Sequence, residues 1–230
     1  MSDRHYSKTL ERHLIPPLQA RNTEQLVQML DSLSKSEQRT AGYMLGERLL
    51  LDCPTEVFWQ MSEALVCYDS RAYLITLMKT FLVRLQRGTA SLSDTAFSRL
   101  AQTFNDVERQ KVALHLLPHL KEPEQVGRLF DILRISKGRE QMVYLVRIDT
   151  LPCLFLLLRS LRYIEHDREQ VLKVARVLIK RGTGPSFNLA SIIKVAFGLD
   201  ELSGTFSLRL QPYQIDRLEQ SYEAFCQSVG

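Results

Sequence analysis

Residues 151–182 decide the fold, and they read LPCLFLLLRSLRYIEHDREQVLKVARVLIKRG. The first half of this segment is apolar almost all the way round a helix, whereas the second half is amphipathic with a basic polar side. We predict two antiparallel helices that are joined at residues 165–167, with the first helix deep in the core. Asp167 and Gln170 form a capping-box pattern at the start of the second helix. Gly182 is typical of a helix end.

The same theme of a capping residue, an amphipathic run and a short break recurs from Asn22 onward. Capping boxes are predicted at Ser34–Glu37 and Asn105–Glu108. One helix pair takes roughly 30–36 residues, as in helical repeats. We therefore predict an all-α protein of stacked antiparallel helical hairpins, a HEAT-like α-solenoid or α-α superhelix. An irregular multi-helix bundle is the alternative. The pattern resembles the broad class of HEAT-type helical repeats, in pattern only.

The ends of the chain and two short segments depart from this theme. Residues 1–21 are polar and basic, and Pro16-Pro17 is predicted to break any helix there, so we expect a short N-terminal arm or a lead-in segment that packs on the domain. Residues 22–230 are predicted to form a single helical-repeat domain. Residues 142–148 suit a strand or a helix, and we favour helix. Residues 206–210 alternate as in an extended segment, and a last helix is expected after them.

The composition indicates a soluble globular protein. The chain has 230 residues, of which 45% are hydrophobic and 24% are charged, close to the globular average. Its four cysteines show no close pairing, so we expect reduced, buried thiols in a cytoplasmic protein. The N-terminus lacks a signal-peptide pattern. The longest apolar run, 151–158, is far shorter than the roughly 20 residues of a membrane span, so we expect no membrane association.

The positive charge of the chain is concentrated in the segment that decides the fold. The net charge is +4, and residues 151–182 carry seven basic and three acidic residues, while the rest of the chain is balanced. This basic stripe is a candidate surface for nucleic acid or another anion. An ordinary solvated helix face explains the same pattern. The candidate residues are Arg159, Arg162, Lys173, Arg176, Lys180 and Arg181.

Three further motifs have a functional and a simpler structural explanation. The loop 180–186 has the ingredients of an anion site, but a helix C-cap glycine followed by a proline-containing turn explains the same residues and is favoured. His115 and His119 are spaced to face one metal ion, yet no third ligand follows, so structural histidines are expected. Trp59 is expected to be a core or groove aromatic. Some HEAT-like enzymes that act on damaged DNA bases use a tryptophan, but their other residues cannot be matched here.

These observations favour a non-enzymatic scaffold or protein-interaction module, because helix pairs recur along the sequence and it contains no recognisable catalytic motif. The expected partner is another protein or a second copy of the chain, and no catalytic residue, metal or cofactor is expected. The alternative is a nucleic-acid-binding protein, including a HEAT-like DNA-modifying enzyme, that uses the basic surface at 159–181.

Overall fold

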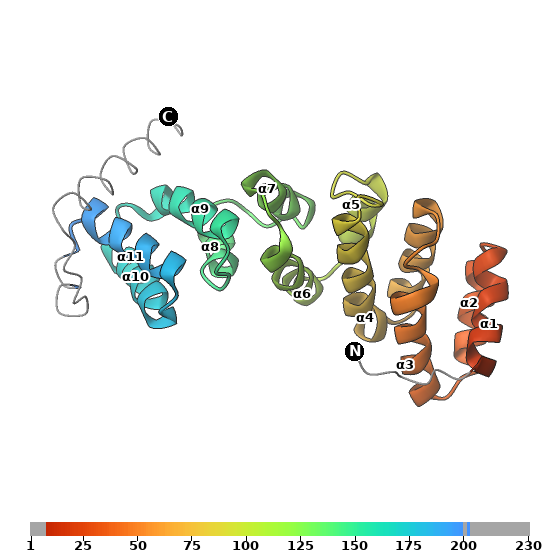
Figure 1. Cartoon of the computed structure of the whole chain (residues 1–230). Coiled ribbons are helices and arrows are strands. Elements are labelled where there is room, and N and C mark those ends of the chain that lie inside the picture. The colour runs from red at the N-terminus through yellow and green to blue at the C-terminus, as the bar shows by residue number, and fades with distance from the viewer. Residues whose placement is uncertain (1–7, 200–201, 203–230) are drawn as a thin grey trace. The chain divides into compact units, whose positions relative to one another are not determined.

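The computed structural model describes residues 8–199 and 202 of the chain. Every regular element among these residues is helical, and they contain no strand (Figure 1). The predicted all-α class is therefore confirmed, while the stacked-hairpin arrangement stays a prediction. Contacts divide the chain into two compact units, Met1–His119 and Leu120–Gly230. That residues 22–230 form a single helical-repeat domain also stays a prediction.

Unit 1 is organised around the long helix α4. This helix packs on α2, α3, α5 and α6, and it is kinked at Asp69, whose φ and ψ of −155° and 89° are not helical. Trp59 and Phe81 of α4 meet Phe97 of α5, with ring centroids 4.7–5.5 Å apart, in a buried aromatic cluster. The helices are α1 (Lys8–Gln19), α2 (Thr23–Asp31), α3 (Lys35–Met44), α4 (Thr55–Gln86), α5 (Thr95–Gln102) and α6 (Asp106–Leu116), with a π-helical turn η1 (Leu45–Leu49) and a 3-10 turn η2 (Leu117–His119).

Helix α1 corrects the prediction of a helix broken at Pro16-Pro17. Both prolines lie inside α1, which continues to Gln19. Leu10 and Leu14 are buried, and α1 packs against α2 and α3, so tertiary packing overrides the loss of two backbone donors. The described part of the predicted arm is therefore a packed helix.

Local capping signals place helix starts correctly. Ser34 and Asn105 each form the predicted reciprocal capping box, with Glu37 and Glu108 respectively. Asp167 accepts a hydrogen bond from the backbone amide of Gln170 at 3.1 Å, which is the N-cap half of the third predicted box. These pairs satisfy amide groups that a helix cannot bond internally, which is why they mark helix starts so reliably.

Unit 2 is organised around α9. This helix packs on α7, α8 and α11, and α11 also packs on α10. Residues 142–145 belong to the helix α8, as predicted, whereas residues 146–148 follow its end and are not helical. The helices are α7 (Pro123–Ile132), α8 (Arg139–Leu145), α9 (Leu151–Ser160), α10 (Arg168–Arg181) and α11 (Gly184–Ala196), with a 3-10 turn η3 (Leu161–Ile164) between α9 and α10. The predicted segments at 206–210 and after 211 lie outside the described residues.

Helix α9 is less deeply buried than its apolar sequence predicts. Cys153, Leu154 and Leu157 face the core, but Leu151 is 73% exposed and Phe155 is 39% exposed. The prediction that this helix lies deep in the core therefore holds for one side of the helix only, because neighbouring helices cover only part of its circumference. Among the described residues no helix is long and apolar enough to cross a membrane.

Replacing Leu157 by alanine is expected to lower the free energy of unfolding by about 2–5 kcal/mol, because its side chain is fully buried. The matched change Leu158→Ala removes the same atoms from a half-buried position, so its loss is expected to be about half as large. Urea denaturation of both variants tests this difference. Equal losses would contradict the orientation of α9.

The cysteines fit the prediction of free thiols but not entirely that of burial. Among the described residues, Cys53, Cys67 and Cys153 are thiols that form no disulfide, and Cys226 lies outside the described residues. Cys153 is buried and Cys53 is half-buried, and burial raises the pKa of both thiols. Cys67 is exposed on α4, which corrects its predicted burial.

Candidate functional site

A cavity in unit 2 gathers positive charge. Its volume is about 230 Å³, and its wall is formed by α7, by the segment that leads into α8, and by α9 with η3. Two of the predicted anion-site residues, Arg159 and Arg162, line it together with Lys137. The remaining lining residues are Pro123, Glu124, Gly127, Asp131, Gln141, Leu156, Ser160 and Tyr163.

Gly138 brings Lys137 close to η3. Its φ of +84° is a conformation that favours glycine. A Cβ at Gly138 would lie 3.2 Å from the Cβ and Cγ atoms of Tyr163, so the absence of a side chain allows close packing. The positive φ and this close approach together explain why the segment before α8 meets the aromatic ring of η3.

The two arginines are positioned by aromatic rings. The Arg162 guanidinium lies 5.0 Å from the centroid of the Tyr163 ring, and its Nη2 donates a hydrogen bond to the phenol oxygen at 3.0 Å. The Arg159 guanidinium lies 5.9 Å from the centroid of the Phe155 ring. Cation–π contacts of this kind hold a guanidinium without neutralising its charge. Within the described part of the chain, neither arginine nor Lys137 forms an ion pair with a carboxylate.

The charge on this wall acts on the phenol of Tyr163. The hydrogen bond from Arg162 lowers the pKa of Tyr163, and the positive charges of Arg162, Lys137 and Arg159 lower it further, against a smaller opposing effect of burial. The pKa of the Tyr163 phenol therefore depends on all three cations. Glu124 and Asp131 of α7 line the same cavity, so it offers both signs of charge.

The predicted residues of α10 do not line this cavity. Lys173, Arg176 and Lys180 are exposed on one side of the helix, as the sequence pattern predicts. Lys173 pairs with Glu169 at 2.8 Å, an exposed pair one helical turn apart, so part of its charge is satisfied locally.

The sequence predicts that Arg181 belongs to the anion surface, and in the structure its guanidinium is engaged by groups of the fold itself. Its guanidinium donates hydrogen bonds to the carbonyl oxygens of Val146 and Ile148, the latter at 3.3 Å, and to the Asp149 carboxylate at 3.3 Å. It also donates to the Ser186 hydroxyl at 2.9 Å. These contacts fasten the end of α10 to the loop between α8 and α9.

Arg181 and Ser186 of the loop 180–186 donate hydrogen bonds to a carboxylate of the same chain, that of Asp149. Gly182 ends α10 with a φ of +73°, as the C-cap interpretation predicts. Ser186, in the first turn of α11, donates a hydrogen bond to Asp149. Burial alone would raise the pKa of Asp149, but the hydrogen bonds from Ser186 and Arg181 help to lower it below its ordinary value. The basic and helix-start groups of this loop are therefore used inside the fold.

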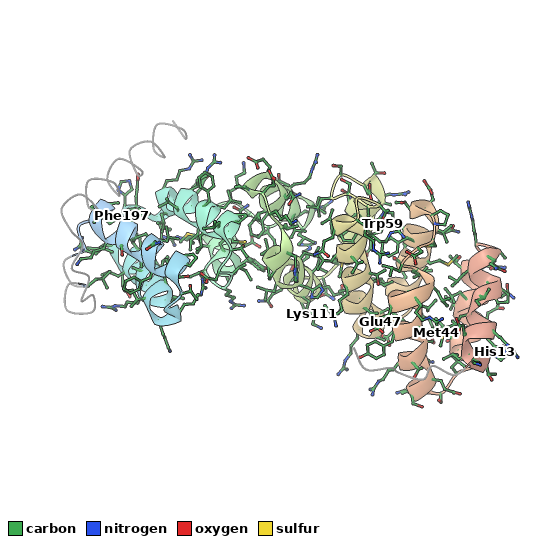
Figure 2. The ribbon with its side chains drawn as sticks, viewed as in Figure 1. His13, Met44, Glu47, Trp59, Lys111 and Phe197 are labelled. Atoms are coloured by element: carbon green, nitrogen blue, oxygen red, sulfur yellow. The ribbon has the colours of Figure 1, made fainter. Side chains whose placement is uncertain are left out.

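Trp59 is a core aromatic of unit 1, as one of its two predicted placements requires. Its position among the helices of unit 1 is labelled in Figure 2. It is 5% exposed, and its Nε1 donates a hydrogen bond to Asp94 at 3.2 Å. Asp94 also accepts the backbone amide of Ser91 at 3.0 Å, so this carboxylate is engaged in shaping the loop before α5. Trp59 also lines a surface pocket with Glu56 and Glu63, but at 5% exposure its ring lacks the accessible face needed to stack on a base.

His115 and His119 lie with ring centroids 6.3 Å apart. Burial lowers the pKa of His115, and the nearby Lys79 and His119 lower it further. Across residues 8–199 and 202, no group of three or more His, Cys, Asp or Glu side chains is placed to hold a metal ion.

Of the residues that line the cavity, sequence reasoning identified only Arg159 and Arg162, and it missed Lys137 and Gly127 among the others. Lys137 lies outside the segment in which the net charge is concentrated, and only the positive φ of Gly138 brings it to η3. Gly127 gave a signal that could have been used, since a glycine in the middle of an amphipathic helix calls for an explanation. No protein-family model, curated protein or solved structure matches this chain.

Proposed function

We propose that the protein is a non-enzymatic interaction module, built from helical hairpins of the HEAT-like kind, that binds a protein segment at the surface of α9 and η3. The observation that carries the proposal is the mixture, on this surface, of exposed apolar side chains and arginines that form no ion pair with another described residue. Tyrosine, phenylalanine and arginine are enriched at the centres of protein interfaces. We call Leu151, Phe155, Arg159, Arg162 and Tyr163 the α9–η3 surface.

The chemistry of the α9–η3 surface favours an acidic partner with apolar anchors. Leu151, Phe155 and Tyr163 are 73%, 39% and 47% exposed. Arg159 and Arg162 lie against Phe155 and Tyr163, where their charges remain available to a carboxylate. A segment that carries aspartate or glutamate beside leucine or phenylalanine complements both features. The free thiols of Cys53, Cys67 and Cys153 support a location in the reducing cytoplasm.

The Phe155→Ser variant is expected to weaken partner binding at least about tenfold, since truncation of a central aromatic commonly costs 2 kcal/mol or more. The partner is first captured with the immobilised full-length chain from cells that express it, and is then purified and titrated by calorimetry. Val177→Ser is the matched control, because Val177 is 45% exposed but lies on α10.

Two outcomes would overturn this proposal. One is that no captured protein binds the purified chain directly. The other is that Phe155→Ser and Val177→Ser have the same effect on the affinity.

Nucleic-acid binding is the second candidate function, and the exposed basic side of α10 favours it. Arg176 and Lys180 are exposed, and no ion pair engages either of them among the described side chains. Titration with 30-nucleotide single- and double-stranded DNA and RNA separates the two functions. Binding that falls steeply with salt and is lost in the double variant Arg176→Glu, Lys180→Glu would favour nucleic acid. Binding to the protein partner is expected to survive that double variant.

A further inference from the structure

Gly127 occupies a position at which glycine has no structural explanation. It lies in the middle of α7, where glycine is less stable than alanine. A Cβ built at this position meets no atom within 4 Å, so packing does not exclude a side chain. Gly127 lines the cavity of unit 2, and the missing side chain therefore enlarges that cavity.

The other described glycines are explained by the fold. At Gly42 a Cβ would lie 2.9 Å from the Tyr73 ring, and at Gly46 it would lie 2.4 Å from the Thr76 side chain. Gly184 is the first residue of α11, where the interior penalty does not apply. The positions with positive φ are Gly88, Gly138, Gly182 and Gly198. Of the glycines in the described ranges, Gly127 alone has neither a positive φ, nor a close neighbour, nor a position at a helix end that would explain it.

We infer that this cavity is a binding site for a phosphate monoester that also carries an amino group, either as a small molecule or as part of a phosphorylated protein segment. Lys137, Arg159 and Arg162 supply three positive charges, and their N–H groups are the donors that phosphate oxygens require. This inference goes beyond protein binding at the α9–η3 surface, because it names a ligand that enters the cavity.

The two carboxylates of the cavity are the reason that we expect an amino group on the ligand. Glu124 and Asp131 are the acidic residues in the lining of the cavity, and both lie on α7, about two helical turns apart and therefore on the same face. A simple dianion would be attracted by the three cations but repelled by these carboxylates. A ligand with a phosphate and an ammonium group satisfies both signs of charge, since the ammonium can face α7 while the phosphate faces η3.

The size of the cavity and its neutral polar groups limit the ligand further. At about 230 Å³ the cavity is smaller than the roughly 300–1,000 Å³ of sites for drug-sized ligands. Ser160 donates a hydrogen bond to the carbonyl of Leu156 at 2.8 Å, and Gln141 donates to the carbonyl of Ile135 at 3.5 Å. These side chains are already engaged, so the charged groups provide the recognition.

O-phosphoethanolamine is the probe that tests the inference, with the full-length chain observed by amide NMR. Saturable shifts are expected at the amides of Gly127 and Arg162. The dissociation constant is expected to be at least about tenfold lower than that of inorganic phosphate, because phosphate alone leaves the α7 carboxylates unpaired. Arg162→Gln is expected to weaken binding at least about tenfold. Arg176→Gln, which removes an exposed cation outside the cavity, is the matched control and is expected to have no effect.

Gly127→Leu provides the decisive variant. Its side chain enters the cavity, so binding of O-phosphoethanolamine is expected to be lost, whereas the thermal midpoint is expected to be unchanged or higher because leucine favours helix. The inference would be overturned if the probe gave no saturable shifts, or if Gly127→Leu bound it as tightly as the unmodified chain.

An acetylated phosphoserine-lysine peptide, titrated in parallel, identifies the source of the ligand. Tighter binding of the peptide assigns the site to a phosphorylated protein segment, and tighter binding of the free probe assigns it to a small molecule.

Discussion

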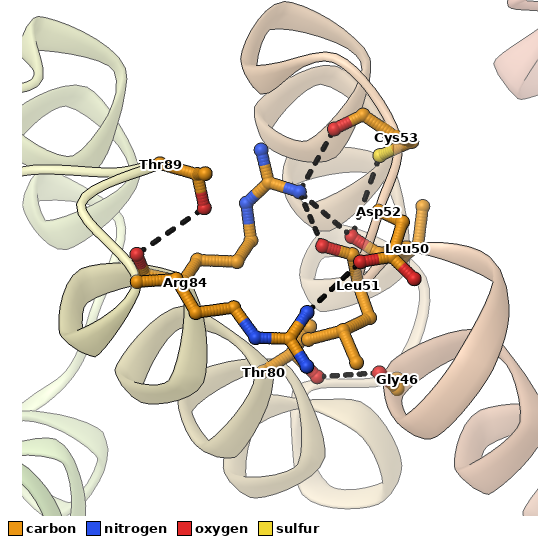
Figure 3. Close-up of polar contacts among 9 residues, drawn as sticks. Gly46, Leu50, Leu51, Asp52, Cys53, Thr80, Arg84 and Thr89 are labelled. Carbon is orange, nitrogen blue, oxygen red and sulfur yellow. Dashed lines mark hydrogen bonds and ion pairs between the residues drawn. The ribbon is translucent and has the colours of Figure 1, made fainter.

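Replacing Arg84 by methionine is expected to lower the free energy of unfolding of unit 1 by about 3–5 kcal/mol. Arg84 is 2% exposed and is the largest fully buried side chain among the described residues. Its Nη1 donates hydrogen bonds to the carbonyl oxygens of Leu50, Leu51 and Cys53 at 3.2, 2.7 and 2.8 Å (Figure 3). Methionine fills much of the volume but removes this donor from the carbonyls of Leu51 and Cys53, and leaves the Leu50 carbonyl with only the Cys53 thiol as a donor.

The π-helical turn before Leu50 explains why an arginine is needed there. The turn Leu45–Leu49 ends α3, and the chain then runs through residues 50–53 without a helix to supply donors. Carbonyl groups at a helix end must find partners elsewhere, and a buried guanidinium offers several donors in one plane. Arg84 reaches them from α4 and thereby joins two segments more than 30 residues apart.

Guanidinium denaturation of Arg84→Met measures this loss. Arg87→Met is the matched control, because Arg87 is half exposed and pairs with the exposed Asp52 at 2.9 Å. That surface pair is expected to contribute no more than about 1 kcal/mol. Similar effects of the two changes would show that the buried hydrogen bonds of Arg84 do not stabilise unit 1.

Replacing Arg181 by methionine is expected to lower the free energy of unfolding of unit 2 by about 2–4 kcal/mol at neutral pH. The reason is that Arg181 donates hydrogen bonds to two backbone carbonyls and to Asp149. Its neighbour Lys180 is exposed, so Lys180→Met is expected to change stability by less than about 0.5 kcal/mol. Urea denaturation of both variants is the measurement, and equal effects would contradict the structural role of Arg181.

The effect of Arg181→Met is also expected to depend on pH. The pKa of Asp149 is lowered in the folded chain, so the stability contributed by its carboxylate is complete above its ordinary pKa of 3.8 and is lost as the pH falls through the folded value. The difference between the variant and the unmodified chain is therefore expected to shrink in acid. A difference that grows as the pH falls would contradict this assignment.

Local patterns were sufficient to predict the helical class and many helix boundaries. The capping boxes at Ser34 and Asn105 and the end of α10 at Gly182 depend on residues within one turn of each other. The helical stripe of α10 likewise identified its exposed and buried sides. Such features follow from hydrogen bonding and periodicity inside one element, which a single sequence contains.

Features that depend on distant contacts could not be predicted in this way. Lys180 and Arg181 are adjacent and similar in charge, yet only Arg181 meets residues more than 30 positions away. Pro16 and Pro17 remain inside a helix because α2 and α3 pack against it. The burial of α9 on only part of its circumference depends on where α7, α8 and α11 lie. Each of these outcomes is decided by tertiary packing rather than by the local pattern.

Photo-cross-linking from defined positions tests most directly whether the α9–η3 surface binds the partner. Benzoylphenylalanine is placed at Leu151, which is 73% exposed on α9, or at Val177, which is exposed on α10. The proposal predicts that the purified partner cross-links efficiently from position 151 and only weakly from position 177. Equal cross-linking from both positions, or stronger cross-linking from position 177, would contradict it.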